Sequence, residues 1–377
     1  MRRWAPNNVY QNNSISVNFM AWPDNLIYLV ALLISAWFVT PASRESPCPT
    51  STPLCAMKAR SQSPISKIEF WKAALERPLE QRIGPAPEEL VTYLALDNIV
   101  QGIPHVPQSM PVSDDVLDDV KAALAELPPT VRQLLSDNLV GIHFVRGLGG
   151  TAFTDYVAGD STHEAAAFVV LDMEVLGSHL ANSWATWKEI SPFITHPRFR
   201  LEVELERKEG NTRKNAIQYI LLHELGHVLS IGRAIHPPWQ LPVSAERPPR
   251  NYAFSKLSWK LNEAGTGYTS LFEGEFARRK DVVFYFGALL GADQMASVYE
   301  QLEQTNFVTL YGATAPADDF ADAFASYVHT VLMGRPLEIR IFQDEQLVKT
   351  YLSCWAETRC AEKRKVIEQL LQSTPKS

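Results

Sequence analysis

The chain has 377 residues, of which 46% are hydrophobic and 20% are charged, and its formal net charge is −7. This length and apolar content suffice for the core of one large domain or of two. No long basic run occurs, and basic residues are not interleaved with aromatic ones. We therefore expect no nucleic-acid partner.

The N-terminus has the composition of an export signal. Residues 26–39 form an apolar run (LIYLVALLISAWFV), which is shorter than the roughly 20 residues of a membrane-spanning helix. Two arginines precede this run, and small residues follow it up to Ala42, where we expect cleavage. We predict that 1–42 is a signal peptide and that the protein is exported, periplasmic or secreted. An uncleaved N-terminal membrane anchor is the alternative, and Met20 is an alternative start.

Four cysteines occur as two close pairs, Cys48 with Cys55 and Cys354 with Cys360. Four cysteines allow three connectivities, and pairing within each couple is the simplest. Disulfides agree with an exported protein, whereas the alternative is four reduced thiols. The segment 43–64 is rich in Ser, Pro and Thr, and we predict that it is a linker.

Residues 65–138 are predicted to form a helical N-terminal region. Apolar residues follow helical spacing in the segments 65–77, 87–101, 113–127 and 130–138. This region carries no motif with recognisable chemistry, so we interpret it as a supporting layer.

The next segments have the patterns of strands. Val140, Ile142 and Phe144 alternate with polar or small residues, which is typical of a half-buried strand. A second strand is predicted at 167–171 (AFVVL), and the alternation in 200–206 indicates a third strand or a short helix.

Residues 217–232 (IQYILLHELGHVLSIG) contain an HExxH motif. Residues i and i+4 of a helix lie on one face, so His223 and His227 can point at a single ion. Zinc favours such nitrogen ligands, and Glu224 beside the first histidine can act as a general base towards a water. Gly232 is the expected end of this helix.

The alternative interpretation is a chance HExxH on an ordinary core helix. The other side of the helix is an apolar stripe of Leu222, Leu225 and Leu229, so we expect the helix to be buried. Two histidines and a glutamate are costly to bury without a ligand. We therefore favour one zinc ion per chain, bound by His223 and His227.

Residues 233–310 are predicted to be an insert between the two parts of the site. The segment 236–250 contains five prolines and must be a loop. His236 is an alternative ligand, although a loop histidine is the simpler interpretation. We expect 255–310 to be mostly helical. The insert also contains weak competitors for the metal: Glu263, Glu273 and Glu275.

The segment 311–327 (YGATAPADDFADAFASY) is predicted to contain a helix that starts near Pro316 with acidic residues in its first turn. Asp318 and Asp322 share one face of this helix, one turn apart. A site needs this arrangement when one carboxylate ligates zinc and the next orients a histidine ligand. His329 shares the face but lies too far along the helix axis, so we interpret it as structural.

The HExxH motif and this segment together resemble the zincin metallopeptidases of the anthrax lethal factor type. In that pattern a tyrosine lies seven residues before a ligand glutamate, and a second glutamate follows four residues after it. Tyr311, Asp318 and Asp322 stand at these spacings. The resemblance implies that Asp318 is the third zinc ligand, that Asp322 supports a ligand histidine, and that Tyr311 donates to the oxyanion.

This chain departs from the family pattern because both acidic positions are Asp rather than Glu. Aspartate is one methylene shorter, so its helix must lie closer to the ion. Zinc accepts either carboxylate. Asp319 and Asp322 therefore stay open as rival third ligands.

We thus predict an α+β, predominantly helical fold, with a zincin-like core in 139–377 and a small mixed sheet beside the HExxH helix. The predicted function is zinc-dependent hydrolysis of a peptide or protein substrate, with Glu224 as general base and Tyr311 as oxyanion donor. Two alternatives stay open, a zinc-binding envelope protein without peptidase activity and a metal-dependent hydrolase of a cell-wall amide. Membrane contact is expected only through an uncleaved N-terminal segment.

Overall fold

The computed structural model describes residues 52–159, 164–239, 251–285 and 287–372. The described chain has an α+β fold that is predominantly helical, as predicted. Within these ranges, no helix combines the length and the apolar character needed to cross a membrane. The predicted signal peptide or anchor lies outside the described residues.

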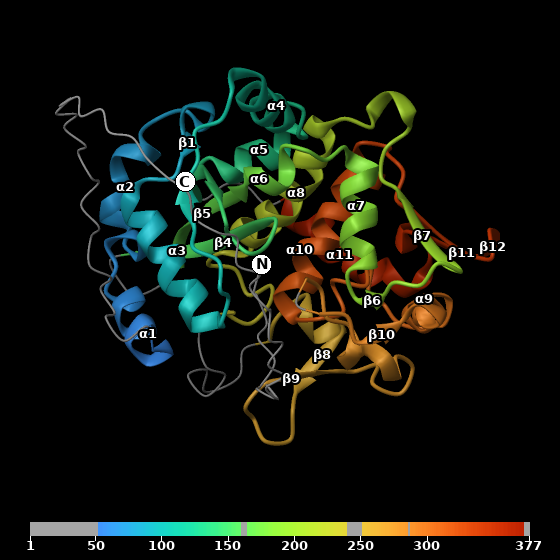
Figure 1. Cartoon of the computed structure of the whole chain (residues 1–377). Coiled ribbons are helices and arrows are strands. Elements are labelled where there is room, and N and C mark those ends of the chain that lie inside the picture. The colour runs from blue at the N-terminus through green and yellow to red at the C-terminus, as the bar shows by residue number, and fades with distance from the viewer. Residues whose placement is uncertain (1–51, 160–163, 240–250, 286, 373–377) are drawn as a thin grey trace, which may run out of the picture.

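A five-stranded mixed sheet lies beside the HExxH helix, as expected (Figure 1). Its strands are β1 (Ile83–Pro85), β2 (Gln108–Ser109), β3 (Leu139–Arg146), β4 (Ala152–Ala158) and β5 (Glu164–Asp172). The order is β1-β3-β5-β4, in which the first three strands are parallel and β4 is antiparallel to β5. The predicted strands at 140–144 and 167–171 are β3 and β5. The sequence analysis missed β4, which forms one edge of the sheet.

Helices pack on both faces of this sheet. Those of the front third are α1 (Pro53–Ser61), α2 (Ile68–Leu75), α3 (Glu88–Gln101), α4 (Asp114–Ala125) and α5 (Pro129–Leu135). On one face, α2 and α3 bury Trp71 and Leu90 against Phe168 of β5. On the other face, α4 and α5 join the larger core with α8 (Arg213–Ser230). The four predicted front helices are confirmed, and they are divided between the two faces of the central sheet.

The described part of the segment 43–64 is not a linker, contrary to the prediction. Thr52 accepts a hydrogen bond from the Cys55 amide, and Pro53 occupies the first position of α1. Ala56 on α1 is buried against Leu96 of α3. Serine, threonine and proline here serve as residues that begin a helix, which a composition-based interpretation does not distinguish from a linker.

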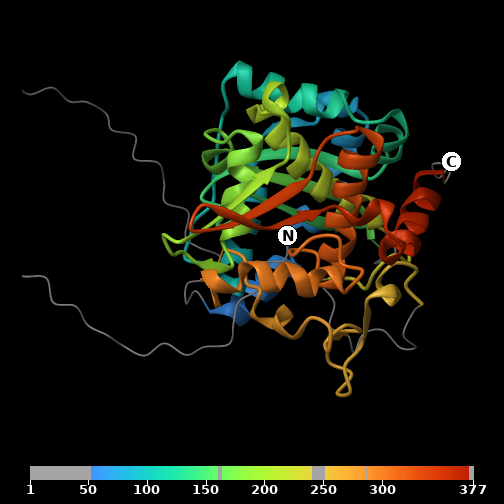
Figure 2. The ribbon, with the colours of Figure 1, turned by 90° about the vertical axis from the view of Figure 1, so that its right-hand side faces the viewer.

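The second half of the chain adds a separate three-stranded antiparallel sheet, ordered β12-β11-β7. Its strands are β7 (Phe199–Glu204), β11 (Glu338–Gln343) and β12 (Gln346–Leu352). Figure 2 shows the β11–β12 hairpin as two long red ribbons. The possible strand at 200–206 therefore exists, but it pairs with β11 rather than with the central sheet. The remaining helices are α6 (Met173–Leu176), α7 (Ala181–Ile190), α9 (Met295–Glu303), α10 (Pro316–Tyr327) and α11 (Ala361–Gln372).

The prediction that 255–310 is mostly helical is wrong. The described residues of this insert contain only one helix longer than a short 3₁₀ turn, α9, alongside the hairpin of β8 (Trp259–Leu261) and β9 (Tyr268–Ser270). β10 (Leu290–Gly291) pairs with β6 (Phe193–Ile194). The Asn262 side chain accepts from the Thr266 amide (3.0 Å) and Gly265 has a φ of 64°. Local turn chemistry thus overrides the helical spacing of the apolar residues.

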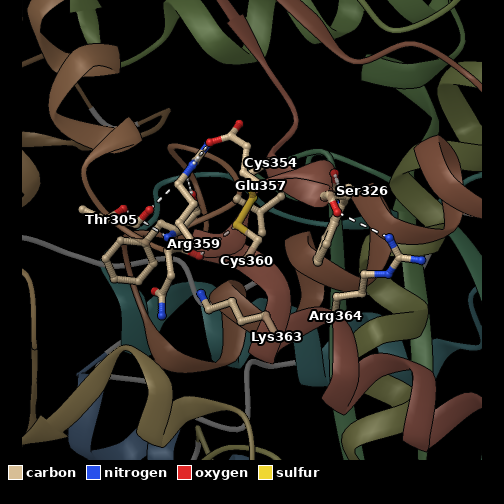
Figure 3. Close-up of a disulfide and its surroundings, with 12 residues drawn as sticks. Thr305, Ser326, Cys354, Glu357, Arg359, Cys360, Lys363 and Arg364 are labelled. Atoms are coloured by element: carbon tan, nitrogen blue, oxygen red, sulfur yellow. Dashed lines mark hydrogen bonds and ion pairs between the residues drawn. A yellow bond between two sulfur atoms is a disulfide. The ribbon is translucent and has the colours of Figure 1, made fainter.

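A disulfide joins Cys354 to Cys360 at the start of α11, as predicted (Figure 3). Between them, Arg359 donates to the carbonyl oxygens of Thr305 (3.1 Å) and Phe307 (3.2 Å). These contacts attach the start of α11 to the segment that precedes α10. The other predicted pair includes Cys48, which lies outside the described residues.

Candidate metal centre

Helix α8 carries the HExxH residues through the interior of the protein. Its apolar stripe is fully buried (Leu222, Leu225 and Leu229). The helix ends at Ser230, and Gly232 follows with a φ of 65°, the left-handed conformation that commonly ends a helix. The predicted buried helix and its stop are therefore confirmed.

Two histidines of α8 and one aspartate of α10 converge. His223 Nε2 lies 3.8 Å from Asp318 Oδ1, and His227 Nε2 lies 3.7 Å from the same atom. All three side chains are buried, and these three atoms have no hydrogen-bond partner among the described residues. Ligand atoms of a tetrahedral zinc ion lie about 3.3 Å apart. The residues therefore fit a zinc ion after a small contraction.

Burial favours the neutral forms of these side chains, which suits His227 as a ligand and makes the charge of Asp318 costly without a cation. It lowers the pKa of His227 well below the usual value, which keeps the imidazole neutral and able to ligate. Burial also raises the pKa of Asp318. A cation between the three side chains would offset this desolvation and would partner the unpaired lone pairs.

Asp322 supports the first histidine from the next turn of α10. Its Oδ1 accepts a hydrogen bond from His223 Nδ1 (2.5 Å), which leaves Nε2 facing Asp318. Its Oδ2 accepts from Thr309 Oγ1 (2.5 Å) and lies 3.6 Å from Lys188 Nζ. Burial disfavours the charge on Asp322, but Lys188 and the hydrogen bonds outweigh it and lower the pKa of this carboxyl. Asp322 is thus an ionised acceptor that orients His223.

Glu224 lies beside the histidines and is anchored from the edge of the central sheet. Thr154 of β4 donates a hydrogen bond from Oγ1 to Glu224 Oε2 (2.6 Å). Glu224 is fully buried and is not part of the converging ligand group. One oxygen of its carboxylate is therefore fixed by β4.

Tyr311 packs against the ring of His223. Their ring centroids are 5.6 Å apart in an edge-to-face arrangement. Burial raises the pKa of Tyr311 well above 10, and the neighbouring Asp318 raises it further. The phenol therefore stays protonated and keeps a hydrogen that it can donate.

The remaining acidic candidates lie away from the converging atoms. Asp319 points to the other side of α10, where it accepts from Lys363 Nζ (2.5 Å) and Trp259 Nε1 (3.0 Å). Asp322 contacts the histidine rather than joining the ligand group. In the insert, Glu273 pairs with Arg279. Two further candidates are exposed: Glu263 and Glu275.

The two extra histidines have separate roles. His329 Nε2 lies within hydrogen-bond distance of the carbonyls of Leu205 (2.8 Å) and Pro336 (3.0 Å), which makes it structural, as predicted. His236 is buried near the centre, with its ring 5.6 Å from that of Trp239. Its Nδ1 donates to the Pro237 carbonyl (2.8 Å). His236 does not belong to the converging group.

Three residues that contact the centre have no counterpart in the sequence analysis: Lys188, Thr154 and Thr309. Lys188 belongs to α7, Thr154 to β4, and Thr309 to the segment before α10. Ordinary polar residues at these positions form no motif, because only long-range packing brings them to the centre.

Comparison of the chain with family models, with curated proteins and with solved structures found no match.

Proposed function

We propose that this protein is a zinc-dependent peptidase. The observation that carries the proposal is the convergence of His223 Nε2, His227 Nε2 and Asp318 Oδ1, each buried and without a hydrogen-bond partner among the described residues. Two histidines and one carboxylate, with a further position left for water, are a typical donor set for a catalytic zinc ion. One zinc ion per chain would be held by these three residues.

Each neighbouring residue has a role in hydrolysis under this proposal. When bound, zinc would supply Lewis acidity that acidifies a water and polarises a carbonyl group. Glu224 accepts the proton of the attacking water on its carboxylate and delivers it to the leaving amine. Tyr311 donates its phenolic hydrogen to the oxygen that becomes negatively charged. Asp322 keeps His223 in the tautomer that presents Nε2.

The position of β4 supports an extended peptide as the substrate. This strand is antiparallel to β5 and lies at the edge of the central sheet. Among the described residues, one isolated bridge, from Lys67 to Ala158, lies beside the end of β4. An extended peptide can add to the edge of a sheet through main-chain hydrogen bonds. Thr154, which holds Glu224, belongs to the same strand, so a peptide paired there would pass beside the general base.

The N-terminal sequence supports export as the setting of this activity. An apolar segment preceded by arginines fits a signal peptide, and the alternative is an anchor formed by the same segment. The disulfide between Cys354 and Cys360 agrees with an oxidising compartment. The proposed substrate is accordingly an extracytoplasmic peptide or protein.

The decisive variant is Glu224→Gln, with Glu263→Gln as a matched control at an exposed position of the insert. We expect wild-type protein to bind one zinc ion and to cleave a broad peptide library. Glu224→Gln should keep the zinc and lose at least about 100-fold in kcat, because a general base is removed, whereas Glu263→Gln should match the wild type. Retained hydrolysis by Glu224→Gln would contradict this mechanism.

The same assay separates the other two functions. A zinc-loaded wild-type protein that cleaves no peptide would favour a binding role without catalysis. Cleavage of cell-wall fragments, with no cleavage of peptides, would favour the cell-wall amide as substrate.

A further inference from the structure

Lys188 is a buried lysine that lies beside Asp322 of the candidate metal centre. It lies on α7 with 5% of its surface exposed, and its Nζ is 3.6 Å from Asp322 Oδ2. Removing an ammonium group from water costs several kcal/mol unless it is paired. We therefore expect the buried charge of Lys188 to serve specific contacts.

The ammonium group of Lys188 contacts both halves of the site. On one side it faces Asp322, which holds His223. On another side it lies 4.5 Å from the centre of the Tyr311 ring. A cation held this close to the face of a buried aromatic ring is attracted to the ring electrostatically. Lys188 therefore touches Asp322, which orients the ligand His223, and Tyr311, the proposed oxyanion donor.

The surroundings of Lys188 hold the ammonium in this place. The rings of Trp184 and Phe284 each lie 5.8 Å from Nζ. The adjacent Glu189 is engaged by the Tyr299 hydroxyl (2.7 Å). A cavity of about 20 Å³ borders Lys188, Glu189 and Thr309.

The carboxylate of Asp322 divides its two oxygens between these neighbours. Oδ1 accepts the hydrogen bond from His223, whereas Oδ2 accepts one from Thr309 and faces Lys188. With Lys188 replaced, Oδ2 would keep only its hydrogen bond from Thr309 among the described residues, so the carboxylate that holds His223 would be less firmly fixed in place. The replacement would also remove the contact that fixes one face of Tyr311.

We propose that Lys188 is a positioning residue, which orients His223 through Asp322 and orients Tyr311 through its ring. This inference rests on the proposed zinc peptidase function. It assigns to α7 a part in the site, although α7 supplies no ligand. Among the described residues, Lys188 has no hydrogen bond or ion pair with the converging ligand atoms or with Glu224, so its contacts with the centre are those with Asp322 and Tyr311.

The chain offers a matched control on the other side of α10. Lys363 is also buried and pairs with Asp319 (2.5 Å), and its Nζ lies 4.9 Å from the Phe307 ring. Lys188→Met and Lys363→Met therefore each remove one buried lysine from one aspartate of the same helix. Only the first of these aspartates contacts a histidine of the centre.

The experiment measures zinc affinity by competition with a chelator, and kcat and KM on a cleaved peptide, for both variants of the full chain. We expect Lys188→Met to weaken zinc binding about 10-fold and to lower kcat at least 10-fold with KM within about twofold, as for loss of an outer-shell partner. Lys363→Met should lower the melting temperature but keep the zinc affinity. Lys188→Gln, which is polar and of similar length, replaces Lys188→Met if that variant does not fold.

A double-mutant cycle decides whether Lys188 acts through Asp322. In the Asp322→Asn background, Lys188→Met should weaken zinc binding by less than about twofold, because the intermediary is already lost. Equal losses in both backgrounds, or equal zinc affinity of Lys188→Met and wild type, would overturn the inference and leave the peptidase proposal standing. Failure of the wild type to bind zinc would overturn the peptidase proposal and this inference with it.

Discussion

Replacement of Gly226, the fourth residue of HExxH, tests how closely α8 and α10 must approach to assemble the centre. A Cβ atom added at Gly226 would lie 2.8 Å from Ala321 Cα and 3.2 Å from Ala321 O. Ala321 lies on α10, between Asp318 and Asp322. Ordinary contacts of a Cβ begin at about 3.4 Å, so Gly226→Ala must move α10 away by roughly half an ångström or more.

Two opposing effects decide the sign of this change. Alanine in the interior of a helix is more favourable than glycine by about 1 kcal/mol. Overpacking of a buried backbone contact costs about 1–3 kcal/mol. The clash is with main-chain atoms, which cannot rotate away, so we expect the upper part of that range. The net destabilisation of Gly226→Ala should be about 1–2 kcal/mol.

The displacement should affect zinc binding more than stability. Aspartate has a short side chain, so Asp318 cannot extend to follow a retreating helix. We expect zinc affinity to fall at least 10-fold, measured by chelator competition, while denaturant unfolding reports the loss of stability. Gly274→Ala is the control, because a Cβ there meets nothing within 4 Å. Wild-type stability and zinc affinity in Gly226→Ala would refute the close-approach argument.

Three further predictions follow from the same contacts. Asp318→Asn should lose zinc in metal analysis. Asp319→Asn should keep zinc but lose about 3–5 kcal/mol of unfolding free energy in urea, because it breaks a buried ion pair. The reverse pattern would mean that Asp319 is the ligand and Asp318 the structural residue. Thr154→Val should bind zinc normally but reduce kcat about 10-fold, because the hydrogen bond that orients Glu224 is lost; an unchanged kcat would exclude that orienting role. Burial lowers the pKa of His329 to about 4, below its unfolded value near 6.5, so stability should fall as pH drops from about 6.5 to 4. Between pH 7 and pH 4.5, the free energy of unfolding measured with urea should fall by about 2 kcal/mol less in His329→Gln than in the wild type. Equal falls in the two proteins would contradict the lowered pKa of His329.

The part of the site that could be predicted from sequence is the part set by helix geometry. The spacing of His223 and His227, and that of Asp318 and Asp322, requires only that each pair lies on one helix. The structure brings both pairs together without any change to those local assignments. Tyr311 was placed by its resemblance to a family pattern, and it lies beside His223.

Contacts between distant segments could not be predicted in this way. Thr154 reaches Glu224 from a strand that the sequence analysis missed, and Lys188 reaches Asp322 from α7. Neither residue carries a local pattern, because its role depends on how helices and sheet pack. The prediction of a mostly helical insert failed for a related reason. The turn at Asn262, and not the spacing of apolar residues, decides the local structure there.

The choice between Asp318 and Asp319 as ligand depends on contacts made by the opposite face of α10. Adjacent helical residues point about 100° apart, so the sequence allowed either one to face the histidines. Lys363 on α11 pairs with Asp319, and the disulfide at the start of α11 helps to fix that helix. Rotation of α10 to bring Asp319 into the centre would leave Lys363 buried without its partner, at a cost of several kcal/mol. The buried ion pair on the far side of α10 therefore accounts for the position of Asp319 and agrees with Asp318 as the residue that faces the two histidines.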